Sequence, residues 1–583
     1  MRNKTRKQST IKAFYLLLVV FAICQSTNYF SQPNDVIIIT GEGLREVEPA
    51  YRIKESPILI DTTMLTKVSE YPRLSLHYES KAIANAIAPG KLKNSRRNIR
   101  LYNGYAKLGI GSQITPIAEI QYGSSRDKEH QYGVYAKHLS SYSKIRDYAP
   151  SQFDRTALGL YGSILKRKFS LSGSLDYRTH GFHYYGWPNS SDTIQSIDIA
   201  QRYQNIAFST RYSSHKKDSA NLNYSIGFRY NHFNTKKPLE DTLFAWRSSE
   251  NNLLFNTKFW YKHGKELFSA DLDVKYNGFI YGMPDSSLTL IDTGYILNNT
   301  IISLKPNIIT QFMDNRFRVE VGLNLSLDIH NETKFYVFPK AEVKYSLFND
   351  IFIPYAGITG GITQQTLSKI STINEFVVPQ VHLKNEKNPF SFYAGIKGVI
   401  SNRMSFNSSF NYSSINDKLF FVLDTNNLTP SKFNLMYDSL NVSKIEGSLS
   451  YQISEKLKAD VIGRFYSYEL KNNSYGWYLP QFEFITRASY NLHSKFIFNF
   501  DLSVETGRKA LLLSDEEGSY VENNQIVMDL GPLVDMNLGV EYRYNKRISA
   551  FIQFNNTAAQ RYMKWHNYPV QGFQLIGGVT ARF

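Results

Sequence analysis

The chain has 583 residues, carries a formal net charge of +17, and contains 41 tyrosines and 38 phenylalanines but one cysteine. A chain of this length could form several soluble domains, but no break in composition divides it, and one cysteine excludes a disulfide-held fold. The aromatic-rich mixture favours β-structure, and a mean hydropathy of −0.35 is compatible with a membrane protein in which only alternate residues meet lipid.

Residues 1–31 are predicted to be a cleaved signal peptide. A basic start precedes the apolar run Ala13–Ile23, which is too short to cross a bilayer as a helix; the alternative is a membrane anchor. Cleavage between Cys24 and Gln32 would lower the net charge to +12, because residues 1–31 contain five basic and no acidic residues. We expect an exported basic chain to meet anionic lipid headgroups, or anions in a lumen, and not nucleic acid.

The next segment, 32–98, shows no regular alternation apart from a strand-like run at Arg73–Tyr78. We interpret it as a periplasmic N-terminal segment, and a placement partly inside the fold that follows is the alternative. From Ile99 onward, apolar and polar residues alternate persistently. In 317–329, for example, seven apolar residues alternate with six that are polar, charged or glycine. Side chains alternate across a strand, so each such segment has one apolar and one polar face.

The lengths of the links between these segments form a second pattern. Short and long links alternate along most of the chain, with exceptions near 112–115 and 330–331. The short links are expected near 123–129, 165–168, 214–218, 262–265, 312–316, 348–351, 399–402, 453–456, 493–495 and 544–547. The long links are expected near 140–152, 178–200, 233–247, 283–297, 366–385, 416–442, 470–478, 506–530 and 561–572.

Together these patterns predict an all-β fold, a transmembrane antiparallel up-and-down β-barrel over 99–583. The segments number about 22, with 16–20 strands as alternatives. A soluble sandwich or solenoid would show the same alternation, but the strands are long enough to cross a bilayer, their polar faces are charged, and aromatic residues recur near their ends. The final strand ends on Phe583, with Ala581 and Val579 on its apolar face, and it should pair with the strand near Ile99 to close the barrel.

Several stretches resemble a known family: Tyr71–Leu76, Leu101–Gly111, Tyr135–Ser141, Phe433–Asp438 and Gly447–Tyr451. They are similar to plug-lacking outer-membrane barrels of the Bacteroidota, which are Gram-negative bacteria, and these barrels are described as TonB-dependent-receptor-like or porin-like. The resemblance implies a location in the cell outer membrane and contact with outer-membrane lipid. It also implies insertion by the barrel-assembly machinery, for which the strand ending at Phe583 would be the signal. It implies no catalytic residues and no cofactor.

One short motif resembles a TonB box, the exported segment that pairs as an added strand with the energy-transducing protein TonB. It consists of Asp35, Val36, Ile37, Ile38, Ile39 and Thr40. The alternative is that any acidic residue followed by β-branched residues near an N-terminus has this appearance.

The sequence contains no metalloprotease, nucleophile-elbow or phosphate-loop motif, so we predict no catalytic, cofactor or metal site. His180 and His183 lie close together but lack neighbouring ligands. The following aromatics, Phe182, Tyr184, Tyr185 and Trp187, are expected either in an interface girdle or, as the alternative, on an outer binding surface.

Three functions therefore stay open at this point. The first is a conduit for small solutes across the outer membrane, porin-like or TonB-receptor-like. The second is a non-conducting accessory barrel that binds periplasmic or surface proteins in an assembly or secretion complex. The third is a lipid-modifying or proteolytic barrel, which would need a Ser/His or Asp/His cluster at one rim.

Overall fold

The computed structural model describes residues 102–124, 127–187, 199–215, 222–235, 247–282, 295–330, 332–424, 431–453 and 456–583. The predicted signal peptide, the segment 32–98 and the TonB-box-like run Asp35–Thr40 lie outside these residues and stay predictions.

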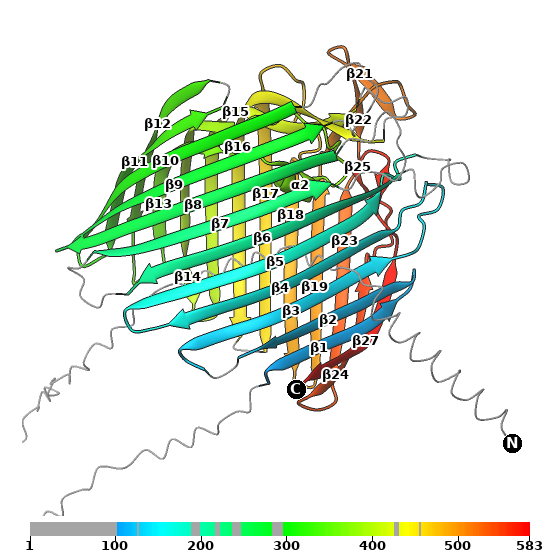
Figure 1. The fold of residues 1–583 in the computed structure, drawn as a ribbon, viewed down its shortest axis with the longest axis horizontal. Coiled ribbons are helices and arrows are strands. Elements are labelled where there is room, and N and C mark those ends of the chain that lie inside the picture. Colours follow the sequence, from blue (N-terminus) through cyan, green and yellow to red (C-terminus); the bar gives the residue numbers. More distant parts are fainter. Residues whose placement is uncertain are drawn as a thin grey trace, which may run out of the picture. The chain divides into compact units, whose positions relative to one another are not determined.

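The described residues form a closed sheet of 22 antiparallel strands (Figure 1). Each barrel strand pairs with the barrel strand that follows it, and β1 (Gly104–Gly111) pairs with β27 (Gln574–Arg582), which closes the ring. The predicted up-and-down barrel of about 22 strands is therefore confirmed. In the first half the strands are β2 (Thr115–Gly123), β3 (His130–Ser141), β4 (Phe153–Leu165), β5 (Phe169–His183), β6 (Ala200–Ser214), β7 (Asn223–Thr235), β8 (Arg247–His263), β9 (Glu266–Gly282), β10 (Tyr295–Phe312) and β11 (Phe317–Ile329).

The second half of the barrel contains the longest strands and all of the smaller elements. Its barrel strands are β12 (Thr333–Tyr345), β13 (Ile353–Thr363), β14 (Glu386–Ser401), β15 (Met404–Leu423), β16 (Phe433–Ile453), β17 (Leu457–Leu470), β18 (Phe482–Leu492), β19 (Phe496–Thr506), β23 (Leu533–Arg543) and β24 (Ile548–Asn555). The smaller elements lie in the links: α2 (Leu367–Ile373), β20 (Lys509–Leu512), β21 (Ser519–Glu522), β22 (Gln525–Asp529), β25 (Met563–Trp565) and β26 (Tyr568–Pro569).

The seam between the first and last strands is made of close backbone contacts. The amide of Gly104 donates to the carbonyl of Phe583 at 2.8 Å, and the amide of Phe583 donates back at 3.0 Å. Gly578 faces Gly109 across the seam, and a Cβ added to Gly578 would lie 2.2 Å from the carbonyl oxygen of Leu108. Glycine is required there because the two backbones approach too closely for a side chain.

The two faces of the barrel wall differ as the alternation predicts. On β11, Val321 and Leu323 are 55% and 45% exposed on the outside, and exposed apolar side chains recur in this way from strand to strand. The inside carries ion pairs, such as Lys305 with Asp273 at 2.6 Å and Lys344 with Glu342 at 2.5 Å. An apolar outer face and a charged inner face are the pattern of a barrel that separates lipid from a watery lumen.

The links also follow the predicted rhythm. One end of the barrel, here named the short-link end, carries turns such as 313–316, 402–403 and 493–495. The other, the long-link end, carries most of the long connections, and the expected short exceptions at 112–114 and 330–332 also fall there. Among the described residues no helix is both long and apolar enough to cross a membrane.

Candidate functional site

The candidate site is the long link between β13 and β14, residues 364–385, which turns into the barrel. We name it the lumen strap. Its only regular element within the described residues is α2, a helix of 7 residues, which begins because the side chain of Thr366 accepts a hydrogen bond from the amide of Lys369 at 3.2 Å. The helix ends at Asn374, whose side chain accepts from the amide of Phe376 at 3.0 Å. Leu367 and Ile370 are almost completely buried, so α2 packs into the interior.

The barrel wall holds the start of the strap through a buried carboxylate. Glu250 on β8 has no exposed surface, and its two oxygens accept hydrogen bonds from the amides of Leu367 at 2.7 Å and Ser368 at 2.9 Å. Asn277 on β9 donates to the same carboxylate at 3.0 Å. The carboxylate of Glu250 thus accepts from two of the amides that a helix leaves unpaired in its first turn. A carboxylate at this position of β8 therefore serves to hold the strap.

A second carboxylate fixes the strap just beyond α2. The side chain of Glu375 lies 3.0 Å from the guanidinium of Arg155 on β4, and its Oε2 lies 3.3 Å from Nε2 of His180 on β5. The hydroxyl of Tyr203 on β6 donates to the Glu375 carbonyl at 2.8 Å. Burial alone would raise the pKa of the Glu375 carboxyl, but His180 and Arg155 outweigh it and hold the pKa below its ordinary value. The strap is thus tied by an ion pair to the wall formed by β4, β5 and β6.

Hydrogen bonds from the wall and from the strap itself hold the rest of the strap. Val377 forms a parallel bridge with Phe433 at the start of β16, and the amide of Val378 donates to the Phe433 carbonyl at 2.9 Å. The hydroxyl of Ser248 on β8 donates to the carbonyl of Pro379 at 2.5 Å. Because β8 and β16 are different parts of the wall, the strap crosses the lumen and contacts both. At its end, Asn385 donates to Asp328 on β11 at 2.8 Å.

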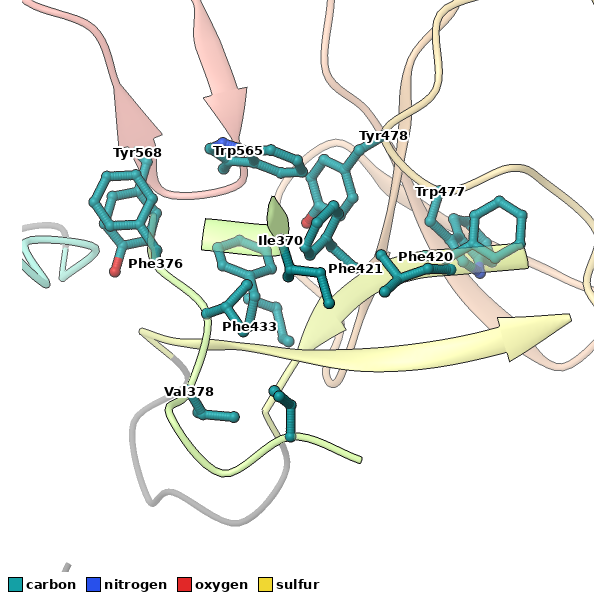
Figure 2. Close-up of a cluster of buried hydrophobic side chains, with 14 of the residues drawn as sticks. Ile370, Phe376, Val378, Phe420, Phe421, Phe433, Trp477, Tyr478, Trp565 and Tyr568 are labelled. Carbon is teal, nitrogen blue, oxygen red and sulfur yellow. The ribbon is translucent and has the colours of Figure 1, made fainter. Parts of the chain in front are cut away.

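Aromatic and aliphatic side chains fill the space around the strap, as Figure 2 shows. Phe376 of the strap stacks on Tyr568 of β26 with the ring centroids 3.7 Å apart and the planes inclined by 21°. Phe433 has no exposed surface and contacts both Trp565 and Tyr478, with ring centroids 5.6 Å away in both cases. Aromatic pairs at these distances add to the free energy of apolar burial. The strap and the long links therefore form one dry cluster inside the long-link end.

Toward the short-link end the wall is wet. The side chains of Lys258 and Lys340 are 52% and 40% exposed although both point into the lumen and form ion pairs there. Glu250, by contrast, has no exposed surface. The lumen is therefore lined by solvated charge on one side of the strap and filled by apolar packing at the level of the strap.

The predicted aromatic site residues belong to this cluster. Phe182 and Tyr184 are 3% and 4% exposed and pack within it, and Tyr185 and Trp187 pack against it. The hydroxyl of Tyr184 donates to the carbonyl of Val377 in the strap at 3.2 Å. The sequence predicted these aromatics either in an interface girdle or on an exposed binding surface. Neither description fits Phe182 and Tyr184, because strand alternation turns Phe182 inward and the strap covers it.

Other predicted residues are placed as follows. His183 contacts the carbonyl of Gln152 at 2.6 Å, and Nε2 of His180 lies 3.3 Å from Oε2 of Glu375. No group of three or more His, Cys, Asp or Glu side chains in the described ranges is arranged to hold a metal ion. Val579, Ala581 and Phe583 lie at the seam with β1.

One Ser–His pair is present, with Ser170 and His215 in contact at 2.9 Å on the short-link end. Within the residues that the structure describes, no carboxylate contacts His215. A nucleophilic serine needs a histidine that is itself oriented by a third group, and the described residues do not supply that group to His215.

Sequence reasoning placed a long link at 366–385 but missed its role. Neither Glu250 nor Glu375 stands out in the sequence, since each is one charged residue among many. The only signal was the length of the link together with its apolar residues Val377, Val378 and Val381, which a solvated outer loop would not need.

No known protein-family model matches the chain, and no curated protein matches it. Its fold is similar to those of solved TonB-dependent receptors. The siderophore receptor PirA from Acinetobacter baumannii is 11% identical, with a TM-score of 0.60, and the match covers 82% of this chain and 80% of that one. The FrpB iron transporter from Neisseria meningitidis is 10% identical, with a TM-score of 0.61 and coverage of 84% and 82%.

The copper transporter OprC is also similar, with 12% identity, a TM-score of 0.58 and coverage of 82% of this chain and 80% of that one. At these identities the likeness establishes a common barrel fold. It does not establish a substrate.

Proposed function

We propose that this protein is an outer-membrane β-barrel that conducts small solutes, and that the lumen strap holds the conduit closed in the described state. A closed ring of paired strands with an apolar outer face is one of the two structures that a bilayer accepts, because every backbone group is paired within the protein. The observation that carries the proposal is the contrast inside the barrel: solvated charge lines one part of the lumen, and a tethered strap fills another.

The orientation follows from the two kinds of link. Barrels of this kind place short turns in the periplasm and long loops outside the cell, so the strap would close the outer mouth. Residues 1–31 would direct export, and 32–98 would remain on the periplasmic side. The strand that ends at Phe583 would be read by the barrel-assembly machinery. The run Asp35–Thr40 would pair with TonB as an added strand, because such pairing relies on main-chain hydrogen bonds.

Conductance in planar bilayers tests the proposal directly. Thr363 and Glu386 face each other in the ladder between β13 and β14, so residues 364–385 can be replaced by a two-residue Asn-Gly turn that suits a hairpin. We expect the full-length protein to be nearly silent and the strapless variant to conduct. Heat-modifiable gel mobility of both proteins shows that each barrel has folded.

Two outcomes would contradict the proposal. If the folded strapless variant is as silent as the parent, the barrel is not a conduit. If the parent conducts as well as the variant, the strap does not close it.

The second candidate is a non-conducting accessory barrel that binds periplasmic or surface proteins. The extent of the buried cluster favours it, since packing that spans several strands could serve rigidity alone. Purification in mild detergent distinguishes the two: an accessory subunit should be recovered with stoichiometric partners, and a conduit should be recovered alone. The transport receptors that share its fold support a function without catalysis, and we propose no enzymatic activity.

A further inference from the structure

A cavity of about 250 Å³ lies at the long-link end, beside the seam between β1 and β27 and apart from the lumen strap. Its lining includes Gln113 from the turn after β1, Lys144 and Arg146 from the link after β3, and Arg561 and Gln571 from the link before β27. A water molecule takes up about 30 Å³ in the liquid, so the cavity has room for a group of several heavy atoms.

The lining is strongly basic. Three cationic side chains and no carboxylate contribute to it. Neither Arg146 nor Arg561 forms an ion pair with a carboxylate in the described part of the chain. The lining therefore includes two guanidinium groups, those of Arg146 and Arg561, without a carboxylate partner among the described residues.

The two amide side chains fix the polar geometry of the cavity. Gln571 donates to the hydroxyl of Ser141 at 2.8 Å. Gln113 donates to the carbonyl of Phe573 at 3.4 Å, but its own Oε1 is buried and lacks a hydrogen-bond partner among the described residues. A buried acceptor without a donor costs free energy, so a ligand that carries a hydroxyl group would be favoured beside it.

Exposed apolar side chains lie next to the lining residues in the sequence. Ile114, Phe573 and Tyr142 are 64%, 45% and 39% exposed. The amide of Tyr142 donates to the carbonyl of Ile114 at 3.3 Å, and the carbonyl of Phe573 accepts from Gln113, so the main chain of the three links is joined beside the cavity. Below Phe573, the exposed side chains of Leu575 and Val579 continue the same apolar face along β27. Basic side chains directly above a lipid-facing surface lie at the height of lipid headgroups.

We propose that this cavity binds the phosphorylated headgroup of a membrane lipid, with Arg146, Arg561 and Lys144 around the phosphate and Gln113 accepting from a headgroup hydroxyl. The planar guanidinium fork matches phosphate oxygens in pairs, and lysine adds a compact charge. The acyl chains would continue down the face formed by Phe573 and Leu575. The proposal uses the membrane location given above but not solute conduction, so a silent barrel would leave it intact.

Native mass spectrometry of the full-length protein in detergent tests the site. The probe is an equimolar mixture of phosphatidylglycerol, an anionic lipid with headgroup hydroxyls, and zwitterionic phosphatidylcholine. We expect the protein to retain phosphatidylglycerol preferentially, and R146Q/R561Q to bind it about tenfold or more weakly, since each basic side chain near a membrane surface contributes measurably to anionic-lipid binding. The matched control R316Q/R547Q removes the same charge from exposed short links at the other end of the barrel and should bind as the parent does.

The same experiment contains the outcomes that would overturn the proposal. Equal losses in R146Q/R561Q and R316Q/R547Q would show that overall charge, and not this cavity, retains the lipid. If excess inorganic phosphate displaces the lipid and binds by itself, the ligand is a soluble phosphate compound and not a headgroup. Heat-modifiable mobility of each variant establishes that it is folded before its lipid binding is compared.

Discussion

The substitution Glu250→Gln should loosen the lumen strap without disturbing the barrel. Both carboxylate oxygens of Glu250 accept from amides of the strap, at 2.7 and 2.9 Å, and glutamine has only one acceptor oxygen. In the variant, one amide of the strap therefore faces the NH₂ group of glutamine and loses its acceptor. The other amide donates to a neutral oxygen instead of a charged one. Since a hydrogen bond to a charged group contributes about 1.5–3 kcal/mol, docking of the strap should weaken by about 3 kcal/mol.

Hydrogen–deuterium exchange measures this change locally. A loss of about 3 kcal/mol corresponds to roughly a hundredfold faster exchange for amides that exchange through strap opening, at about 1.4 kcal/mol per tenfold. Peptides that cover 364–385 should show it, and peptides from β17 and β18 should not. The control Glu342→Gln changes another carboxylate on the lumen wall, whose partners Lys344 and Tyr393 belong to wall strands and not to the strap. Unchanged exchange of the strap in Glu250→Gln, or equal acceleration in the control, would refute the role given to Glu250.

Three further predictions concern other parts of the barrel. The pKa of the Glu375 carboxyl is lowered in the docked strap, so this group stabilises docking fully above its ordinary pKa of 4.5. The stabilisation is lost as the pH falls through the lower pKa of the docked state. Conductance should therefore rise in that acidic range, and Glu375→Gln should show no such step. Gly578→Ala should reduce the heat-modifiable, folded fraction. Gly577→Ala should not, because the atom nearest to its added Cβ would be 3.9 Å away. Phe433→Ala should cost about 3–5 kcal/mol in the buried cluster and lower the unfolding temperature measured by gel shift.

The barrel itself was predictable because its physical cause is periodic. A strand between lipid and water repeats every two residues, so the apolar and polar faces of β11 are visible in the sequence without any knowledge of its neighbours. Link lengths gave an independent check, because both kinds of link recur at fixed ends of the barrel. The first strand begins at Gly104 and not near Ile99, because the alternation in the sequence does not fix where a strand starts.

The strap was not predictable because its causes are not periodic and lie far apart in the sequence. Glu250 and Leu367 are separated by 117 positions, and Arg155 and Glu375 by 220. Whether such residues meet depends on the strand order and register, which fix which wall positions lie at the height of the strap. Phe182 shows the same difficulty: its aromatic character fits a membrane girdle equally well, and only the strap packed over it decides the outcome.

The way in which the strap is held constrains how a conduit of this kind could open. It combines apolar packing with the buried carboxylate of Glu250 and the partly exposed carboxylate of Glu375, so the docked state is favoured by several independent contacts that must be lost together. A solute with equal affinity for the docked and undocked states shifts no population, however tightly it binds. Reversing a 1:99 equilibrium requires about 5.5 kcal/mol of differential binding. Opening therefore needs a ligand that binds the undocked state better. Such a ligand would gain most binding free energy at the polar contacts of the strap. There it can donate to Glu250, or offer a carboxylate to Arg155, in place of the strap's own groups. Conduction by this barrel should accordingly depend on its ligand, and a solute that only diffuses through the lumen should not open it.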